Sequence, residues 1–142
     1  MRIPGWAMNR PVPSDLYAYT EPAEGAPSLK VNGEPVDLGL EKGYALIMRT
    51  WKSGDIVELS LPMPIRRVVA HQAVEADRGR VAIERGPLVY CAEGADNGGR
   101  VSNLVLPDGA ALAAEARPDL LGGVATVTCV VFSARMNCTS TL

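Results

Sequence analysis

Apolar and polar residues alternate along much of the chain, and this alternation predicts β-strands rather than helices. The clearest example is Ile56–Leu61, in which Val57, Leu59 and Leu61 fall on one side and the residues between them on the other. A period of two over this length fits a half-buried strand and does not fit a helix.

A second apolar run, Tyr44–Trp51, lies just before this strand, and Lys52–Asp55 separates the two. Lys-Ser-Gly-Asp is typical of a turn, because glycine tolerates a positive φ and aspartate can bond to nearby backbone donors. Pro62 and Pro64 close the second strand, since proline has no N–H to donate to a sheet. The stretch predicts a β-hairpin around which the rest of the chain is arranged.

Further strand-like segments recur at intervals of about 8–12 residues, with turn signals between them, and this spacing favours a β-sandwich or barrel. They cover residues 16–20, 28–31, 35–38, 65–70, 80–84, 87–92, 101–106 and 124–132. Asn32-Gly33 predicts a tight hairpin between two of them. The sequence therefore predicts an all-β fold, an antiparallel jelly-roll-like sandwich that can be incomplete, in a single domain over residues 1–132.

Two segments depart from the alternation. Ala110–Arg117 is rich in alanine and has helical composition, so at most one short helix is predicted near residues 110–117. After Phe132 the composition becomes small and polar, and residues 133–142 are predicted to form a disordered or non-native tail.

Composition excludes several classes of protein. The chain has 142 residues, of which 47% are hydrophobic and 21% charged, as in ordinary globular domains. A net charge of −2 gives no footprint for nucleic acid or for an anionic membrane. No apolar run reaches the ~18 residues of a membrane span. The N-terminus lacks the apolar core of a secretion signal, so we expect a cytoplasmic location for the chain as given.

Neither a metal site nor a cofactor is predicted. The cysteines Cys91, Cys129 and Cys138 are odd in number and widely spaced, which favours free thiols, although a Cys91–Cys129 or Cys129–Cys138 bridge stays open. One histidine and three scattered cysteines do not make a zinc shell. Asp96-Asn97, in a glycine-rich turn, is more typical of a turn than of a calcium site.

No catalytic residue is predicted either. His71 is the only histidine, and no Gly-x-Ser-x-Gly sequence accompanies it, so a strand-end histidine is the simpler interpretation. Glu58, Glu84 and Glu93 alternate with apolar neighbours as on solvated sheet faces, and nothing marks two of them as the carboxylate pair of a glycosidase.

Aromatic residues are few, and four of them are candidates for stacking on sugar rings. These candidates for carbohydrate binding are Trp6, Tyr19, Tyr44 and Trp51. Trp51 ends an alternating run and is also the kind of residue found in a core or a domain interface.

Four sequence words, in this order, resemble one family. They are RIPGWA (Arg2–Ala7), VNGE (Val31–Glu34), GYALIMRTWKSGDIVELSLPM (Gly43–Met63) and GRVAIERGPLVYCAEGADN (Gly79–Asn97). Together they are similar to the C-terminal β-sandwich region of the DUF1680 group, glycoside hydrolase family 127, the β-L-arabinofuranosidases, over about residues 2–124.

The resemblance implies that catalysis takes place in another part of the enzyme than this chain. Members of that family are several times longer, and catalysis takes place in an N-terminal (α/α)₆ barrel with a cysteine nucleophile, glutamates and a cysteine-rich zinc site. None of those motifs has a counterpart here, and Cys91, within RGPLVYCAE, is not that nucleophile. The family's preceding and closing strands also have no match, so we expect a fragment. Its uncovered sheet edges would pair in a homodimer or higher oligomer.

Three functions follow from these observations. The first is a non-catalytic accessory domain of a family 127-like enzyme, with a role in packing or oligomerisation. The second is a carbohydrate-binding module for plant-type polysaccharides or arabinose-containing glycans, with the four aromatic residues as its platform. The third is a stand-alone glycosidase or esterase with a site around His71, Glu84 or Glu93.

Overall fold

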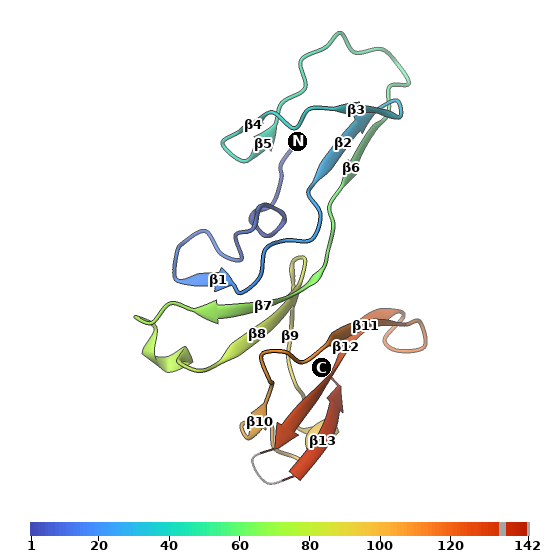
Figure 1. Ribbon diagram of the computed structural model, residues 1–142. Coiled ribbons are helices and arrows are strands. Elements are labelled where there is room, and N and C mark those ends of the chain that lie inside the picture. The colour runs from blue at the N-terminus through green and yellow to red at the C-terminus, as the bar shows by residue number, and fades with distance from the viewer. Residues whose placement is uncertain (134–135, 142) are drawn as a thin grey trace.

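The described residues fold as antiparallel β-structure with three single-turn 3₁₀ helices (Figure 1). The computed structural model describes residues 1–133 and 136–141, and side chains up to Phe132. The elements are η1 (Gly5–Met8), β1 (Tyr17–Tyr19), β2 (Ser28–Val31), β3 (Glu34–Val36), β4 (Leu40–Glu41), β5 (Tyr44–Ala45), β6 (Val57–Ser60), β7 (Ile65–Ala70), η2 (Glu75–Asp77), β8 (Val81–Arg85), β9 (Leu88–Tyr90), η3 (Ala95–Asn97), β10 (Leu104–Val105), β11 (Leu112–Arg117), β12 (Val124–Ser133) and β13 (Met136–Thr141). The all-β, antiparallel prediction is confirmed, and the single-domain boundary at residues 1–132 stays a prediction.

The upper part of the molecule holds two small sheets around an apolar cluster (Figure 1). One sheet has the order β3-β2-β6, and the other is the β4–β5 hairpin. Ile3, Leu29 and Ala45 are buried at the centre of the cluster. The partly buried side chains of Val57 and Leu59 pack against them from β6, on the same side of that strand, as the alternation predicts.

The lower part holds the four-stranded sheet β1-β7-β8-β9 and the sheet β10-β12-β11, with β13 on β12 (Figure 1). The buried apolar residues of this part lie on β7, β8 and β12. Val127, Cys129 and Val131 recur every second residue along β12, so one face of that strand is buried. The two parts therefore have separate cores.

Strand β1 links the two parts. Its residues precede β2 and β6 in sequence, yet they pair with β7 in the lower sheet, Tyr17 opposite Ala70 and Tyr19 opposite Val68. The chain thus supplies an edge strand to the lower sheet before it returns to build the upper one.

The tight hairpin predicted at Asn32-Gly33 is confirmed. Both residues have positive φ, 54° and 82°, as a type I′ turn requires. The Asn32 side chain also holds the start of β6, because its Oδ1 accepts from the Ile56 N–H at 2.8 Å and its Nδ2 donates to Asp55 at 2.8 Å.

We expect Asn32→Ala to lower the free energy of unfolding by about 1–2 kcal/mol, since alanine resists a positive φ and cannot replace the amide contacts. Urea unfolding measures the loss. Asn32→Gly is the matched control, because glycine keeps the backbone and loses only the side chain. Equal stability of Asn32→Ala and the parent chain would show that the amide contacts contribute nothing.

The central hairpin prediction is wrong. The Lys52–Asp55 turn forms, with the Asp55 N–H donating to the Lys52 carbonyl at 3.1 Å, but β6 pairs with β2 instead of with residues 44–51. Only Tyr44–Ala45 of the first run is a strand, and it pairs with β4. The reason is non-local: β2 offers β6 two fully buried residues, Leu29 and Val31. Of residues 46–51, only Ile47 packs against the apolar cluster, and the others are exposed.

The short helix predicted near residues 110–117 is also wrong, because Leu112–Arg117 forms β11. Six residues of this segment lie opposite residues of β12, from Leu112–Cys129 to Arg117–Val124. The helix propensity of alanine, a few tenths of a kcal/mol per residue, is outweighed by a complete antiparallel ladder.

Part of the predicted tail has an assigned backbone. Residues 136–141 form β13 and pair with β12 in an antiparallel register, and residues 134, 135 and 142 lie outside the described residues.

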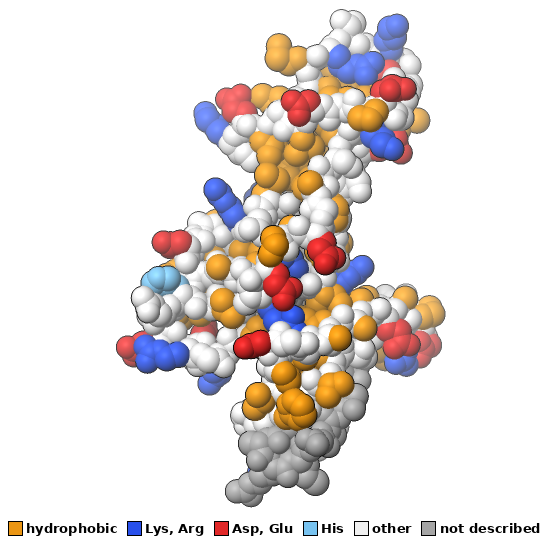
Figure 2. Space-filling view, in the orientation of Figure 1, with side chains coloured by type: hydrophobic (Ala, Val, Ile, Leu, Met, Phe, Trp, Pro, Cys, Tyr) orange, Lys and Arg blue, Asp and Glu red, His pale blue; other side chains and the backbone are white. Residues whose placement is uncertain are grey.

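The molecule exposes much more surface than its size requires. Its accessible surface is 10032 Å², whereas a compact monomer of this mass exposes about 7,100 Å². Large apolar side chains contribute to the difference, with Met48 97% and Val89 66% exposed, and hydrophobic side chains reach the surface in several places on the described part of the visible face (Figure 2). No helix among the described residues is long and apolar enough to span a membrane.

Candidate functional site

Three neighbouring strands of the lower sheet bring Tyr19, Arg66 and Glu84 together. Arg66 on β7 lies directly opposite Glu84 on β8. Tyr19 on β1 lies opposite Val68, two residues from Arg66 along β7, and so on the same face of the sheet. The register of three strands, rather than any local sequence motif, assembles this cluster.

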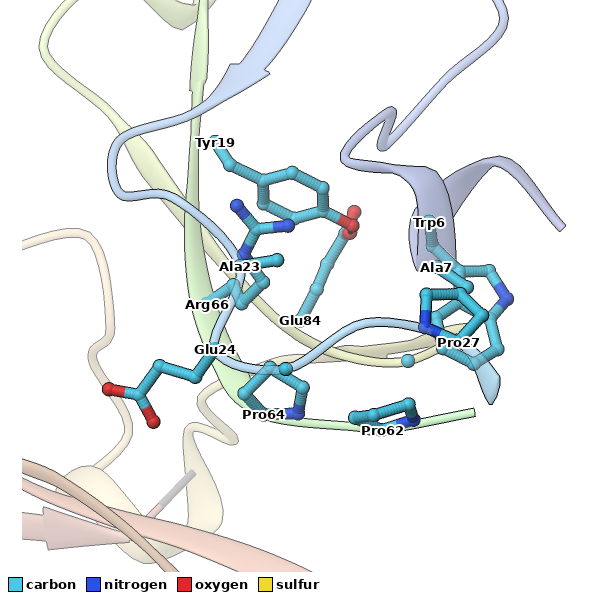
Figure 3. A pocket seen from close by; sticks show the side chains of 12 residues that line it. Trp6, Ala7, Tyr19, Ala23, Glu24, Pro27, Pro62, Pro64, Arg66 and Glu84 are labelled. Atoms are coloured by element: carbon cyan, nitrogen blue, oxygen red, sulfur yellow. The ribbon is translucent and has the colours of Figure 1, made fainter. Parts of the chain in front are cut away.

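The Arg66 guanidinium is the centre of the cluster (Figure 3). Its Cζ atom lies 3.4 Å from the centroid of the Tyr19 ring, and its Nη2 donates to Asn9 Oδ1 at 2.6 Å and to the Glu21 carbonyl. The Tyr19 hydroxyl donates to Glu84 Oε2 at 3.0 Å. Arg66 is only 7% exposed, so one buried cation holds together β7, β1 and the segment after η1.

Burial governs the ionisation of this cluster. It raises the pKa of Tyr19 to about 12, and the hydrogen bond to Glu84 acts in the same direction, whereas the Arg66 charge opposes it. Burial lowers the pKa of Arg66, but a guanidinium stays charged at neutral pH. At neutral pH Tyr19 is thus a neutral donor and not a general base.

The raised Tyr19 pKa predicts a loss of stability in alkali. The pKa of Tyr19 is higher in the folded state than its ordinary value of 10.0. Its contribution is therefore complete below about pH 10 and is lost as the pH rises towards about 12. We expect Tyr19→Phe to flatten the fall of unfolding free energy between about pH 10 and about pH 12, measured by urea unfolding.

Tyr17 needs a parallel measurement, because its hydrogen bond to Asp77 at 2.8 Å also raises its pKa. Tyr17→Phe removes that contribution alone. An alkaline slope that is the same in the parent chain and in Tyr19→Phe would contradict the assignment to Tyr19.

A small pocket opens beside the cluster. Its wall is formed by the indole of Trp6, the prolines Pro27, Pro62 and Pro64, and the side chains of Tyr19, Arg66 and Glu84 (Figure 3). The space inside is ≈ 10 Å³, about the volume that one water molecule needs and too small for a sugar ring. We therefore assign the cluster a structural role.

Of the four predicted sugar-stacking residues, the structure brings only Trp6 and Tyr19 together, on the wall of this pocket. Tyr44 lies on β5 and is 51% exposed. Trp51 lies in the loop before β6, with the Arg49 guanidinium 5.3 Å above its ring. The four residues do not form a single platform.

The other candidates for chemistry also lie apart. His71 follows β7, and its Nδ1 accepts from the Ala73 N–H at 3.2 Å. Asn97 donates to the Glu93 carbonyl at 2.8 Å, which closes the turn at η3. No group of three or more potential metal ligands occurs in the part of the chain that the structure describes.

Two cysteines have defined side chains, and both are free thiols. Cys91 is exposed, and Cys129 is buried on β12, where burial raises its pKa. The side chain of Cys138, and with it the Cys129–Cys138 pairing, lies outside the described residues.

Arg66 is the residue that sequence reasoning missed. A signal was present in the alternation of β7, where Arg66 shares a face with the buried Val68. An arginine on an apolar face indicates a buried, bonded cation.

Two family profiles match the chain, one on each side of Pro64. Residues 1–63 match the beta-L-arabinofuranosidase, GH127 middle domain, and residues 65–139 match the glycoside hydrolase family 127 C-terminal domain.

Characterised proteins give the same result. A non-reducing end beta-L-arabinofuranosidase from Bifidobacterium longum subsp. longum is 41% identical over an alignment of 134 residues, and the match covers 89% of this chain and 17% of the relative. A solved GH127 beta-arabinofuranosidase superposes with a TM-score of 0.86 at 39% identity, over 99% of this chain and 23% of its own. A GH127 beta-L-arabinofuranosidase from Geobacillus stearothermophilus T6 gives a TM-score of 0.75 at 37% identity, over 99% and 22%.

Proposed function

This chain belongs to glycoside hydrolase family 127, from which it carries the middle and C-terminal domains, and we propose that it is a non-catalytic portion that packs against the rest of such an enzyme. It spans 17% of the length of the curated relative that it matches. In its buried polar cluster, Arg66 Nη2 and the Tyr19 hydroxyl donate to internal acceptors, and the pocket beside them has no room for a substrate.

The observation that carries this proposal is the uncovered surface. The chain exposes about 2,900 Å² more accessible surface than a compact monomer of this mass does. A standard interface takes only about 800 Å² from each partner. The excess includes apolar side chains that water solvates poorly, among them Leu46, Met48 and Ile56 in the loop before β6.

A turnover assay tests the proposal. We expect no hydrolysis of a nitrophenyl β-L-arabinofuranoside or of a panel of nitrophenyl glycosides and esters by the purified chain. Turnover that disappears in His71→Ala, Glu84→Gln or Glu93→Gln would overturn the proposal and identify the chain as an enzyme. Turnover that persists in all three variants would indicate a contaminant.

Self-association is a second role that a specific feature favours. Strand β9 is an end strand of its sheet, and Leu88 and Val89 on it are 50% and 66% exposed. Such an edge can pair with a second copy of the chain. We expect light scattering at tens of micromolar to show a dimer or larger species, and Val89→Lys to shift it to monomer. A monomeric parent chain would rule out this role.

A further inference from the structure

A second and larger hollow lies on the upper part of the molecule, between the N-terminal segment and the β4–β5 hairpin. It has a volume of ≈ 760 Å³, within the range of small-molecule sites. Its lining consists of Arg2, Ile3, Pro4, Gly5, Trp6, Met8, Arg10, Pro11, Val12, Pro13, Leu40, Lys42 and Gly43. We call this hollow the Trp6 groove.

The Trp6 groove is positively charged. Arg2, Arg10 and Lys42 line it, and no acidic side chain does. Among the described side chains, those of residues 1–132, none of these three cations takes part in an ion pair. Their charge is therefore available to an anion.

Trp6 is the aromatic residue of the groove. It lines both this groove and the small pocket beside Tyr19, and it is partly buried. The turn at η1 fixes the neighbouring residues, since the Arg10 N–H donates to the Gly5 carbonyl at 2.9 Å. A Cβ at Gly5 would lie 3.1 Å from the Arg10 carbonyl, so this close turn favours glycine. Trp6 and Arg10 are thereby presented together.

We propose that the Trp6 groove binds an acidic oligosaccharide, with the indole stacked on a sugar ring and uronate carboxylates on the cations. Guanidinium groups bind carboxylates by charge-assisted hydrogen bonds, and an indole offers a flat apolar face to the C–H bonds of a sugar. A peptide of aspartate and glutamate could use the cations but offers no ring with a face of C–H bonds to the indole, and this favours the saccharide. The inference does not depend on the packing role proposed above.

Calorimetry with a matched pair of ligands tests this site. We expect trigalacturonate to bind the intact chain saturably at low ionic strength. Its fully methyl-esterified form keeps the rings and loses the charges, and it should bind at least tenfold more weakly. Arg10→Ala and Lys42→Ala should each weaken trigalacturonate binding several-fold. Lys52→Ala, an exposed lysine in the turn before β6, should leave binding unchanged and is the control for net charge.

Tryptophan emission locates the ligand. The chain has two tryptophans, so Trp51→Phe leaves Trp6 as the only indole, and trigalacturonate should change its emission with the calorimetric affinity. The absence of saturable binding would overturn the proposal. Equal affinity for the methyl ester, or an unchanged affinity in Arg10→Ala and Lys42→Ala, would also overturn it. Equally tight binding of oligoglutamate would assign the groove to an acidic peptide instead.

Discussion

Replacing Arg66 with alanine is expected to lower the free energy of unfolding by about 3 kcal/mol, a large part of what a domain of this size possesses. The guanidinium is almost fully buried, donates to Asn9 and to the Glu21 carbonyl, and stacks on Tyr19. Hydrogen bonds from a charged group contribute about 1.5–3 kcal/mol. A desolvated cation–π contact adds about 1–2 kcal/mol. The cost of burying the charge offsets part of this sum.

Urea unfolding with linear extrapolation measures the loss. Arg66→Lys keeps the charge but lacks the planar fork, so it should fall between the parent chain and Arg66→Ala. Arg78→Ala removes an exposed ion pair to Glu75 and should cost less than about 0.5 kcal/mol. If Arg66→Ala were as stable as Arg78→Ala, the cluster would not contribute to holding β1 in the lower sheet.

Features that depend on neighbouring residues could be predicted from the sequence. The Asn32-Gly33 hairpin forms because two adjacent residues adopt positive φ, and no distant contact is required. The strands β7 and β12 likewise appear where alternating residues with turn signals at their ends predict them.

Features that depend on pairing between distant segments could not be predicted. Strand β6 and the run at 44–51 are adjacent and both apolar, but β6 pairs with β2, about 30 residues earlier in the chain. The alanine-rich segment Leu112–Arg117 likewise becomes a strand because it pairs with β12. Sequence patterns show which segments can be strands and do not show which strands meet.

The candidate site follows the same division. Residue type alone singles out Trp6 and Tyr19, which meet at one pocket, but also Tyr44 and Trp51, which do not. Arg66 and Glu84 become a pair only once the register of β7 and β8 is known. The Trp6 groove likewise needs the β4–β5 hairpin to bring Lys42 beside the N-terminal segment.

Separating the chain at Pro64 is expected to unfold the C-terminal half. The family profiles meet there, which suggests that residues 65–142 form an independent domain. The structure argues otherwise, because β7 pairs with β1, a strand from the other half. Separation also removes Tyr17 from Asp77, Tyr19 from Glu84 and both acceptors from the buried Arg66.

We therefore expect residues 65–142 alone to bind a hydrophobic dye and to melt without a cooperative transition, as followed by circular dichroism. Adding a synthetic peptide of residues 9–24 should restore cooperative melting, since it carries β1, Asn9 and Glu21. The same peptide with Tyr19→Ala should restore much less, because it lacks both the ring that stacks on Arg66 and the hydroxyl that binds Glu84. If residues 65–142 melted cooperatively without any peptide, β1 would not be required for the C-terminal half to fold. If the Tyr19→Ala peptide restored cooperative melting as well as the natural peptide does, the stabilisation would come from the backbone hydrogen bonds between β1 and β7. The side chains around Arg66 would then contribute little to joining the two halves.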